Sequence, residues 1–128
     1  MNRKYLAILA VFVVAALAFA ASAFSRSSST PTLKGVVGPG FTISLKKGGK
    51  KVKTLKAGKY KFVISDKSSF HNYTIEREKP SKPHIEKHAT STSGTGMKTF
   101  TMTLKPGSWR AYCSVHEAQM HIDFKVTR

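Results

Sequence analysis

Residues 109–126 read WRAYCSVHEAQMHIDFKV. Apolar side chains occupy every second position of the first five residues, Trp109–Cys113, and again of the segment Ile122–Val126. A period of two is typical of a half-buried β-strand, because successive side chains of a strand point to opposite faces. The segment therefore predicts two strands joined by a short turn, with Cys113 facing the interior at the end of the first strand.

The same alternation recurs along the chain. It is found in the segments 41–45, 60–64, 73–75 and 100–104. Glycine and proline form turn signals at 38–40, 48–49, 57–58 and 105–107. No segment beyond residue 23 has a sustained apolar repeat at helical spacing, so we expect an all-β sandwich with Trp109 and the alternating aromatic residues in its core. The proline-containing segment Glu78–Gly96 is predicted to be an irregular loop with a short helical turn.

The N-terminus has the pattern of a secretory signal peptide. A short cationic start is followed by sixteen apolar residues, Leu6–Ala21, and by the small residues Ala21-Ser22-Ala23. We expect residues 1–23 to be the signal peptide, residues 24–32 a flexible polar leader and residues 33–128 a single domain. The alternative is an uncleaved N-terminal membrane anchor, which would need about 20 apolar residues. In both cases the domain is exported, to the periplasm or the extracellular space.

The chain is strongly basic, with 22 Lys and Arg against 6 Asp and Glu and a formal net charge of +16. Such a charge attracts anionic proteins, anionic lipid surfaces or nucleic acids over a long range. Export argues against nucleic acid as a partner. The single cysteine excludes a disulfide within the chain, and we expect a monomer.

Four residues with metal-ligating side chains stand at suggestive positions. Cys113, His116 and Met120 lie within eight residues of one another, and His71 lies in the segment Ser69–Tyr73. A thiolate, two imidazoles and a thioether are the ligands of a blue-copper site. A lone exported cysteine is otherwise a buried apolar residue or the partner in an intermolecular disulfide.

The axial position of such a site is open to more than one ligand. Met120 could instead be an ordinary core residue at the start of a strand. Gln119 or a backbone carbonyl beside His71 would then be the axial ligand.

In these residues the chain resembles the cupredoxins of the plastocyanin and azurin family, close to their small exported bacterial members. The resemblance covers residues 33–128, and its matching stretches are 37–43, 55–60, 68–73, 103–107 and 112–120. It implies a Greek-key β-sandwich with one mononuclear type 1 copper ion at its loop-rich end. The implied ligands are His71, Cys113 and His116 in the equatorial plane, with Met120 in the axial position.

The resemblance also implies a hydrogen bond between the two ligand loops. Asn72, beside the first histidine, is expected to bond to Ser114, which follows the cysteine. Such partners orient metal ligands and tune the metal. Three residues separate His116 from Met120, and members of the family differ in this length, so the axial bond and the redox potential are not fixed by the sequence.

The expected function is one-electron transfer between redox partners, with copper as the cofactor. A copper chaperone or copper-buffering protein using the same ligands is the alternative. An enzyme is not expected, since copper oxidases and nitrite reductases add histidines, often as His-x-His pairs, and the five histidines here form no such pair. A further alternative is a basic adhesion module that binds no metal. In that case Cys113 and His71 would have no role in the function.

Other polar residues have two interpretations each. Lysines cluster around Gly48-Gly49, either as a solvated hairpin that protects an edge strand or as a docking face for an acidic redox partner. His84 and His88 would share a helix face able to hold a second metal ion, whereas the prolines nearby favour a solvated loop. His121 is expected on the surface, because strand alternation turns it away from Met120.

Overall fold

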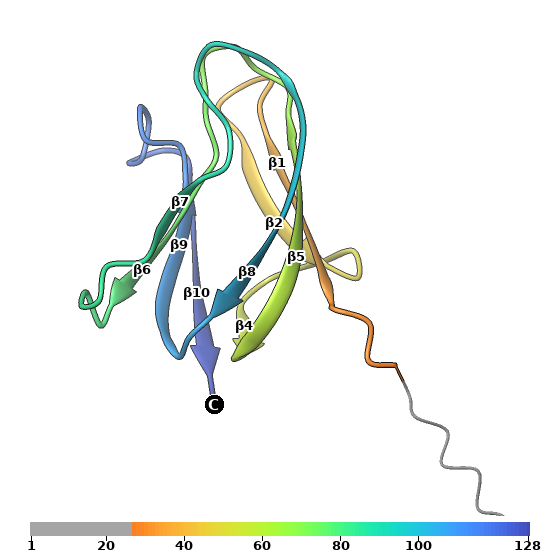
Figure 1. Ribbon diagram of the computed structural model, residues 1–128. Coiled ribbons are helices and arrows are strands. Elements are labelled where there is room, and N and C mark those ends of the chain that lie inside the picture. Colours follow the sequence, from red (N-terminus) through yellow and green to blue (C-terminus); the bar gives the residue numbers. More distant parts are fainter. Residues whose placement is uncertain (1–26) are drawn as a thin grey trace, which may run out of the picture.

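The computed structural model describes residues 27–128, which form two packed β-sheets of five strands each (Figure 1). The first sheet has the strand order β3-β2-β1-β5-β8 and the second β4-β10-β9-β6-β7. The strands are β1 Thr32–Val37, β2 Ile43–Lys47, β3 Lys50–Lys51, β4 Thr54–Lys56, β5 Gly58–Asp66, β6 Thr74–Lys79, β7 Glu86–His88, β8 Gly96–Leu104, β9 Gly107–Tyr112 and β10 His121–Thr127. The predicted all-β sandwich is confirmed, while the predicted signal peptide lies outside the described residues.

Both sheets are mixed. Strand β1 pairs antiparallel with β2 and parallel with β5, and β10 pairs antiparallel with β9 and parallel with β4. Because a parallel pair needs a long crossover connection, the chain passes between the sheets more than once, as a Greek-key sandwich requires. Within residues 27–128 there is no helix with the length and apolarity to cross a membrane.

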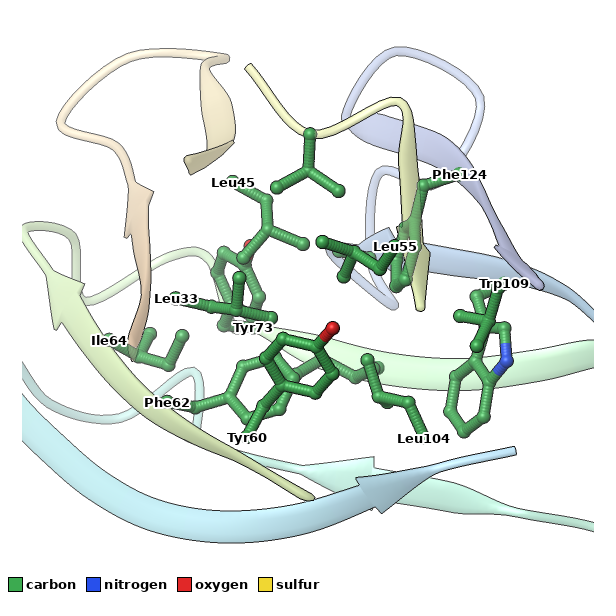
Figure 2. Close-up of a cluster of buried hydrophobic side chains, with 14 of the residues drawn as sticks. Leu33, Leu45, Leu55, Tyr60, Phe62, Ile64, Tyr73, Leu104, Trp109 and Phe124 are labelled. Atoms are coloured by element: carbon green, nitrogen blue, oxygen red, sulfur yellow. The ribbon is translucent and has the colours of Figure 1, made fainter. Parts of the chain in front are cut away.

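The core lies between the inner faces of the two sheets (Figure 2). In β5 the residues Tyr60, Phe62 and Ile64 are buried while Lys59 and Lys61 are exposed, so the predicted alternation is confirmed. Trp109 is fully buried, as predicted. Each large apolar side chain removed from water stabilises the fold by roughly 1.5–3 kcal/mol.

Two predictions for local structure are wrong. Phe41 is 63% exposed and lies before β2, because the Gly38-Pro39-Gly40 turn continues past it and delays the strand. The segment Glu78–Gly96 contains no helical turn; β6 runs on to Lys79, and β7 then pairs with β6 at the edge of the second sheet. Pro80 and Pro83 lie in the irregular connection between these two strands, so they do not interrupt the pairing.

Three loops meet at one end of the sandwich. Val37, the last residue of β1, pairs with Asp66, the last residue of β5, so the loops that follow both strands leave at the same end. Tyr112 at the end of β9 pairs with Thr74 at the start of β6 and with His121 at the start of β10. The β5–β6 loop and the β9–β10 loop therefore adjoin there, in the upper part of Figure 1.

Candidate metal centre

Three metal-ligating side chains meet at this loop-rich end. His71 precedes β6, and Cys113 and His116 lie in the β9–β10 loop. The Nδ1 atoms of His71 and His116 are 3.1 Å apart. The Cys113 Sγ atom lies 3.8 Å from the Nδ1 of His71 and 3.9 Å from the Nδ1 of His116. In the described part of the chain, this is the group of three such residues whose ligand atoms all lie within 4.8 Å of one another.

The spacing of these atoms fits one metal ion. Bonds of about 2.0 Å to imidazole nitrogen and about 2.3 Å to thiolate sulfur, arranged in a plane, separate neighbouring ligand atoms by roughly 3.5–3.8 Å. The two sulfur–nitrogen distances of 3.8 and 3.9 Å match this geometry, and the nitrogen–nitrogen distance of 3.1 Å requires only a small outward shift. The donor set and its spacing therefore suit a first-row transition-metal ion.

The thiol group is shielded and held in one direction. Cys113 is fully buried, and the backbone N–H of Asn72 donates to its Sγ at 3.5 Å. Asn72 comes directly after His71, so this bond ties the sulfur to the loop that carries the first histidine. Contacts of this kind orient a metal ligand before any ion binds.

The loop that carries Cys113 and His116 is closed by its own backbone. The Cys113 N–H donates to the Met120 carbonyl at 3.0 Å, and the Met120 N–H donates to the His116 carbonyl at 2.8 Å. The His116 N–H in turn donates to the Cys113 carbonyl at 3.1 Å. These bonds span three, four and seven residues, so the short loop folds back on itself and brings Cys113 and His116 close together.

A pair of side-chain hydrogen bonds joins the two ligand loops. The Asn72 side-chain amide donates to the Ser114 hydroxyl at 2.7 Å, and the Ser114 backbone N–H donates to the Asn72 side-chain carbonyl at 2.8 Å. The contact between Asn72 and Ser114 that the resemblance implied is therefore present, and it is made twice.

Met120 lies at the base of the ligand loop with its side chain fully buried. Gln119, the alternative considered beside it, is exposed. Burial directs Met120 toward the interior below the loop, and the backbone bonds to Cys113 and His116 keep it next to both ligands.

Phe41 is a site residue that the sequence analysis placed in a strand. Its ring centroid lies 5.2 Å from that of His71 and 5.0 Å from that of His116, both in edge-to-face geometry. The half-buried His116 ring therefore lies beside an exposed aromatic ring. The turn signal directly before Phe41 was the available hint that it does not belong to the strand.

The loop before His71 is shaped by a buried carboxylate that the sequence analysis did not single out. Asp66 accepts a hydrogen bond from the Ser68 N–H at 3.0 Å, and the Ser68 hydroxyl accepts one from the Phe70 N–H at 3.1 Å. Asp and Ser two residues apart are typical of such side-chain turns. These bonds fix the path of the chain into His71.

The phenol below the site is neutral. Tyr73 is fully buried, its hydroxyl donates to the Ser44 carbonyl at 2.8 Å, and burial raises its pKa far above the ordinary range of tyrosine. The two sheets are thereby linked beneath His71 without a charge.

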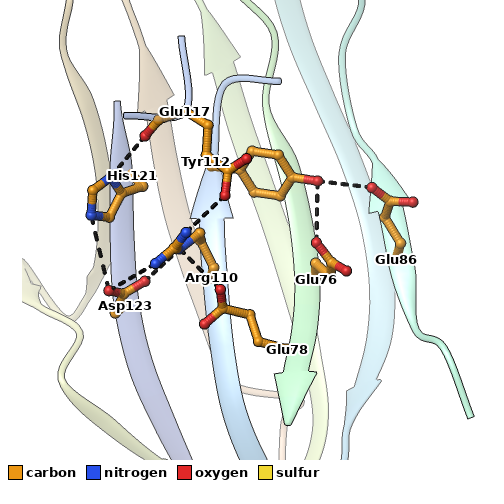
Figure 3. Close-up of polar contacts among 8 residues, drawn as sticks. All are labelled: Glu76, Glu78, Glu86, Arg110, Tyr112, Glu117, His121 and Asp123. Carbon is orange, nitrogen blue, oxygen red and sulfur yellow. Dashed lines mark hydrogen bonds and ion pairs between the residues drawn. The ribbon is translucent and has the colours of Figure 1, made fainter. Parts of the chain in front are cut away.

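Acidic residues gather on the outer face of the second sheet (Figure 3). Of the six acidic residues in the chain, this face and the adjoining β9–β10 loop carry five: Glu76, Glu78, Glu86, Glu117 and Asp123. Hydrogen bonds from Arg110 hold the pKa of Asp123 below its usual value. The Tyr112 hydroxyl donates to Glu86 at 2.9 Å, and this bond, ahead of His84, lowers the pKa of Glu86.

The remaining histidines lie on the same face. His121 is exposed, as predicted. His84 and His88 are exposed as well: His84 lies in the irregular loop before β7, as predicted, whereas His88 is the last residue of the edge strand β7. The structure brings neither of them to the ligand atoms of Cys113.

The lysine cluster lies away from the ligand loops. Gly48 and Gly49 form the predicted turn, with φ values of 54° and 78° that favour glycine. The strands of this hairpin place Lys47 opposite Leu33, near the start of β1, whereas the ligand loops lie beyond the end of β1. Lys51, Lys46 and Lys34 form a row across three neighbouring strands of the first sheet.

A β-sandwich with a buried cysteine between two histidines at one end defines the cupredoxin fold, and this chain has that fold. Solved structures agree. A rusticyanin structure described as a copper protein matches with a TM-score of 0.56 and 17% identity, over 79% of this chain and 80% of that one. Rusticyanin from Thiobacillus ferrooxidans matches at 22% identity with a TM-score of 0.54, over 79% of each chain.

A third structure comes from a different source. Auracyanin A, a blue copper protein from the green thermophilic photosynthetic bacterium Chloroflexus aurantiacus, matches at 16% identity with a TM-score of 0.53. The match covers 75% of this chain and 98% of auracyanin A. No family model and no curated protein sequence matches the chain.

Proposed function

We propose that the protein is an exported one-electron carrier with a single type 1 copper ion bound by His71, Cys113 and His116 and, axially, by Met120. The observation that carries the proposal is the buried Cys113 sulfur with two imidazole nitrogens at 3.8 and 3.9 Å. Copper supplies the chemistry by cycling between Cu(II) and Cu(I). The likeness to copper proteins in the solved structures supports the choice of metal.

The chain's own contribution is to hold the ligands still. The hydrogen bonds of Asn72 to Cys113 and Ser114 and the closed β9–β10 loop fix the donor atoms in both oxidation states. Burial of Cys113 and Met120 keeps water from the ion. A rigid, dry site favours fast electron exchange with the metal retained, whereas a chaperone would need a site that opens to release it.

The ligand end also offers a contact surface for redox partners. Three large apolar side chains are exposed in the loops that carry or adjoin the ligands: Phe41, Phe70 and Val115. His116 is the half-buried ligand among them and provides the route for the electron. The lysines lie too far along the sandwich to share this contact, so we assign them to steering an acidic partner or holding the domain at an anionic membrane surface.

The test is spectroscopic. The exported form of the chain is purified, loaded with one equivalent of Cu(II) and compared with Cys113→Ser by visible absorption and EPR. The proposal expects an intense band in the red visible region and a narrow copper hyperfine splitting in the wild type, both lost in the variant. A pale spectrum in the wild type would refute the thiolate bond.

Two further measurements separate carrier from chaperone and check export. A carrier retains copper through repeated reduction and oxidation, whereas a chaperone transfers the ion to an acceptor apoprotein. Mass spectrometry of the exported chain reports whether residues 1–23 have been removed, and an intact N-terminus would support the anchored form.

A further inference from the structure

Two histidines and two glutamates converge at the edge of the second sheet, outside the centre described above. We propose that Glu76, His84, Glu86 and His88, here called the β7 cluster, bind a second divalent transition-metal ion, Cu²⁺ or Zn²⁺. Both ions take imidazole nitrogen and carboxylate oxygen as ligands. The proposal does not depend on the copper centre at Cys113.

Strand alternation places three of the four side chains on one face. The chain reads His84-Ile85-Glu86-Lys87-His88, and the pairing with β6 continues beyond β7 because the Arg77 N–H donates to the Ile85 carbonyl at 2.9 Å. Ile85 packs against the core, and the Lys87 ammonium lies 5.5 Å from the centre of the Phe100 ring. His84, Glu86 and His88 are left on the outer face.

The Glu86 carboxylate contacts both histidines, and the ligand atoms of the β7 cluster must move closer together to bind one ion, since they do not all lie within 4.8 Å of one another. One carboxylate oxygen of Glu86, Oε2, lies 3.2 Å from the Nε2 of His84 and 3.6 Å from the Nε2 of His88. Tetrahedral bonds of about 2.0–2.1 Å separate two ligand atoms by about 3.3 Å. The imidazole side chains are 61% and 62% exposed, so the His84 ring can turn to bring its ligating nitrogen toward the Nε2 of His88.

Glu76 lies on the neighbouring strand and can supply a fourth ligand once the His84 ring turns, because it now faces the ring nitrogen opposite to the one that Glu86 contacts. It pairs directly with Glu86 in the register of β6 and β7, and its Oε1 atom lies 3.7 Å from the Nδ1 of His84. Two carboxylates and two neutral imidazoles balance the charge of a divalent ion. The rest of the chain is strongly basic, so this concentration of carboxylates is local.

Outer hydrogen bonds hold three of the four ligands. The Tyr112 hydroxyl donates to Glu86 at 2.9 Å and lies 3.3 Å from a carboxylate oxygen of Glu76. The hydroxyl of the buried Thr74 lies 3.0 Å from the Nδ1 of His88, which leaves the Nε2 of that ring for the metal. Hydrogen bonds that orient the ligating side chains in this way are typical of metal sites.

The experiment counts the metal equivalents bound by the full chain in a non-ionic detergent. Zn²⁺ is titrated by calorimetry into the wild type, the double variant His84→Asn/His88→Asn and the control His121→Asn, which removes an exposed histidine from the same face. We expect the wild type and the control to bind one equivalent more than the double variant. Equal stoichiometry in the wild type and the double variant, or loss of the equivalent in the control, would overturn the proposal.

A second arm distinguishes the two ions. Cu²⁺ is added to the same proteins and followed by EPR, where the β7 cluster should give the wide hyperfine splitting of a nitrogen- and oxygen-bound ion, absent in the double variant. If the site binds Cu²⁺ and not Zn²⁺, it is a copper site. If it binds both ions, with a higher affinity for Cu²⁺, the result agrees with the usual order of affinities of divalent metals and supports the proposal. The absence of both ions would overturn the proposal.

Repeating the titration with the variant Cys113→Ser distinguishes the two sites. This variant removes the thiolate of the first centre and leaves every residue of the β7 cluster in place. The extra equivalent should persist in it. Its disappearance would show that the bound ion belongs to the first centre and would overturn the second site.

Discussion

The centre at Cys113 and the β7 cluster use related side chains in opposite surroundings. The first is buried in loops that hydrogen bonds fasten to one another, and its ligands have little freedom to move. The second lies on an edge strand, where the side chains of His84 and His88 are more than 60% exposed. The difference teaches that ligand identity sets which metals can bind, whereas burial and anchoring set how rigidly they are held.

The largest expected effect comes from disturbing the core beneath the buried centre. A Cβ atom at Gly35 would lie 2.6 Å from the Ile64 side chain and 2.8 Å from the Tyr73 ring. Gly35→Ala should lower the free energy of unfolding by about 3 kcal/mol, since an overpacked core must shift both neighbours. Urea unfolding measures the change. Gly40→Ala, where a Cβ meets nothing within 4 Å, is the matched control and should have almost no effect.

Loosening the link between the ligand loops should have the next largest effect. Asn72→Ala removes both bonds to Ser114 and should lower the free energy of unfolding by about 2 kcal/mol, whereas Ser114→Ala removes one and should cost about 1 kcal/mol. Chemical unfolding of each variant measures the ratio. Equal effects of the two variants would contradict the two-bond description. With copper bound, Asn72→Ala should also shift the thiolate absorption band.

The β7 cluster is tested through a residue that supports it without binding the metal. Tyr112→Phe removes the hydroxyl that contacts Glu86 and Glu76 and should weaken Zn²⁺ binding about tenfold. Calorimetry measures the affinity. The visible spectrum of the Cys113 centre should persist, because the ring of Tyr112 is retained. An unchanged Zn²⁺ affinity would show that the hydroxyl does not position these carboxylates.

The smallest effect is expected for the ion pair between Arg110 and Asp123, which lies on the same face as the β7 cluster but is not part of it. Arg110 lowers the pKa of Asp123, so this pair stabilises the fold above the ordinary carboxyl pKa and the contribution disappears as the pH falls through the lowered value. Asp123 is more than half exposed, so Asp123→Asn should cost only a few tenths of a kcal/mol at pH 7. Urea unfolding of the metal-free chain from pH 7 to below about 4 should show the difference shrinking. A difference that grows on acidification would reverse the assigned sign.

The features that the sequence predicted well are local ones. Cys113 and His116 are close in sequence, and period-two alternation identified the strands β9 and β10 on either side of their loop. The axial role of Met120 stays a prediction. His71 was harder to place, because it lies 42 positions before Cys113 and only the strand pairing brings the two together. The fold class followed from alternation and turns alone.

The features that were missed depend on the register between strands. Phe41 alternates correctly with Ile43, yet the turn before it keeps it out of the strand and beside the histidine rings. The prolines near His84 were taken to exclude regular structure over the whole segment, although both lie between β6 and β7 and leave room for the short strand that starts at Glu86. The gathering of carboxylates on one face is invisible in the sequence, since the carboxylates come from three strands, β6, β7 and β10, and from the β9–β10 loop.

The row Lys51, Lys46 and Lys34 and the carboxylates of the second sheet lie on opposite outer faces, so the molecule carries an electric moment across its thickness. Adsorbed on a negatively charged electrode, it would lie flat on the first sheet, with the loop-rich end pointing along the surface. Electrons would then leave the loop-rich end parallel to the electrode surface. A neighbour adsorbed on the same plane would be reached more readily than the electrode beneath.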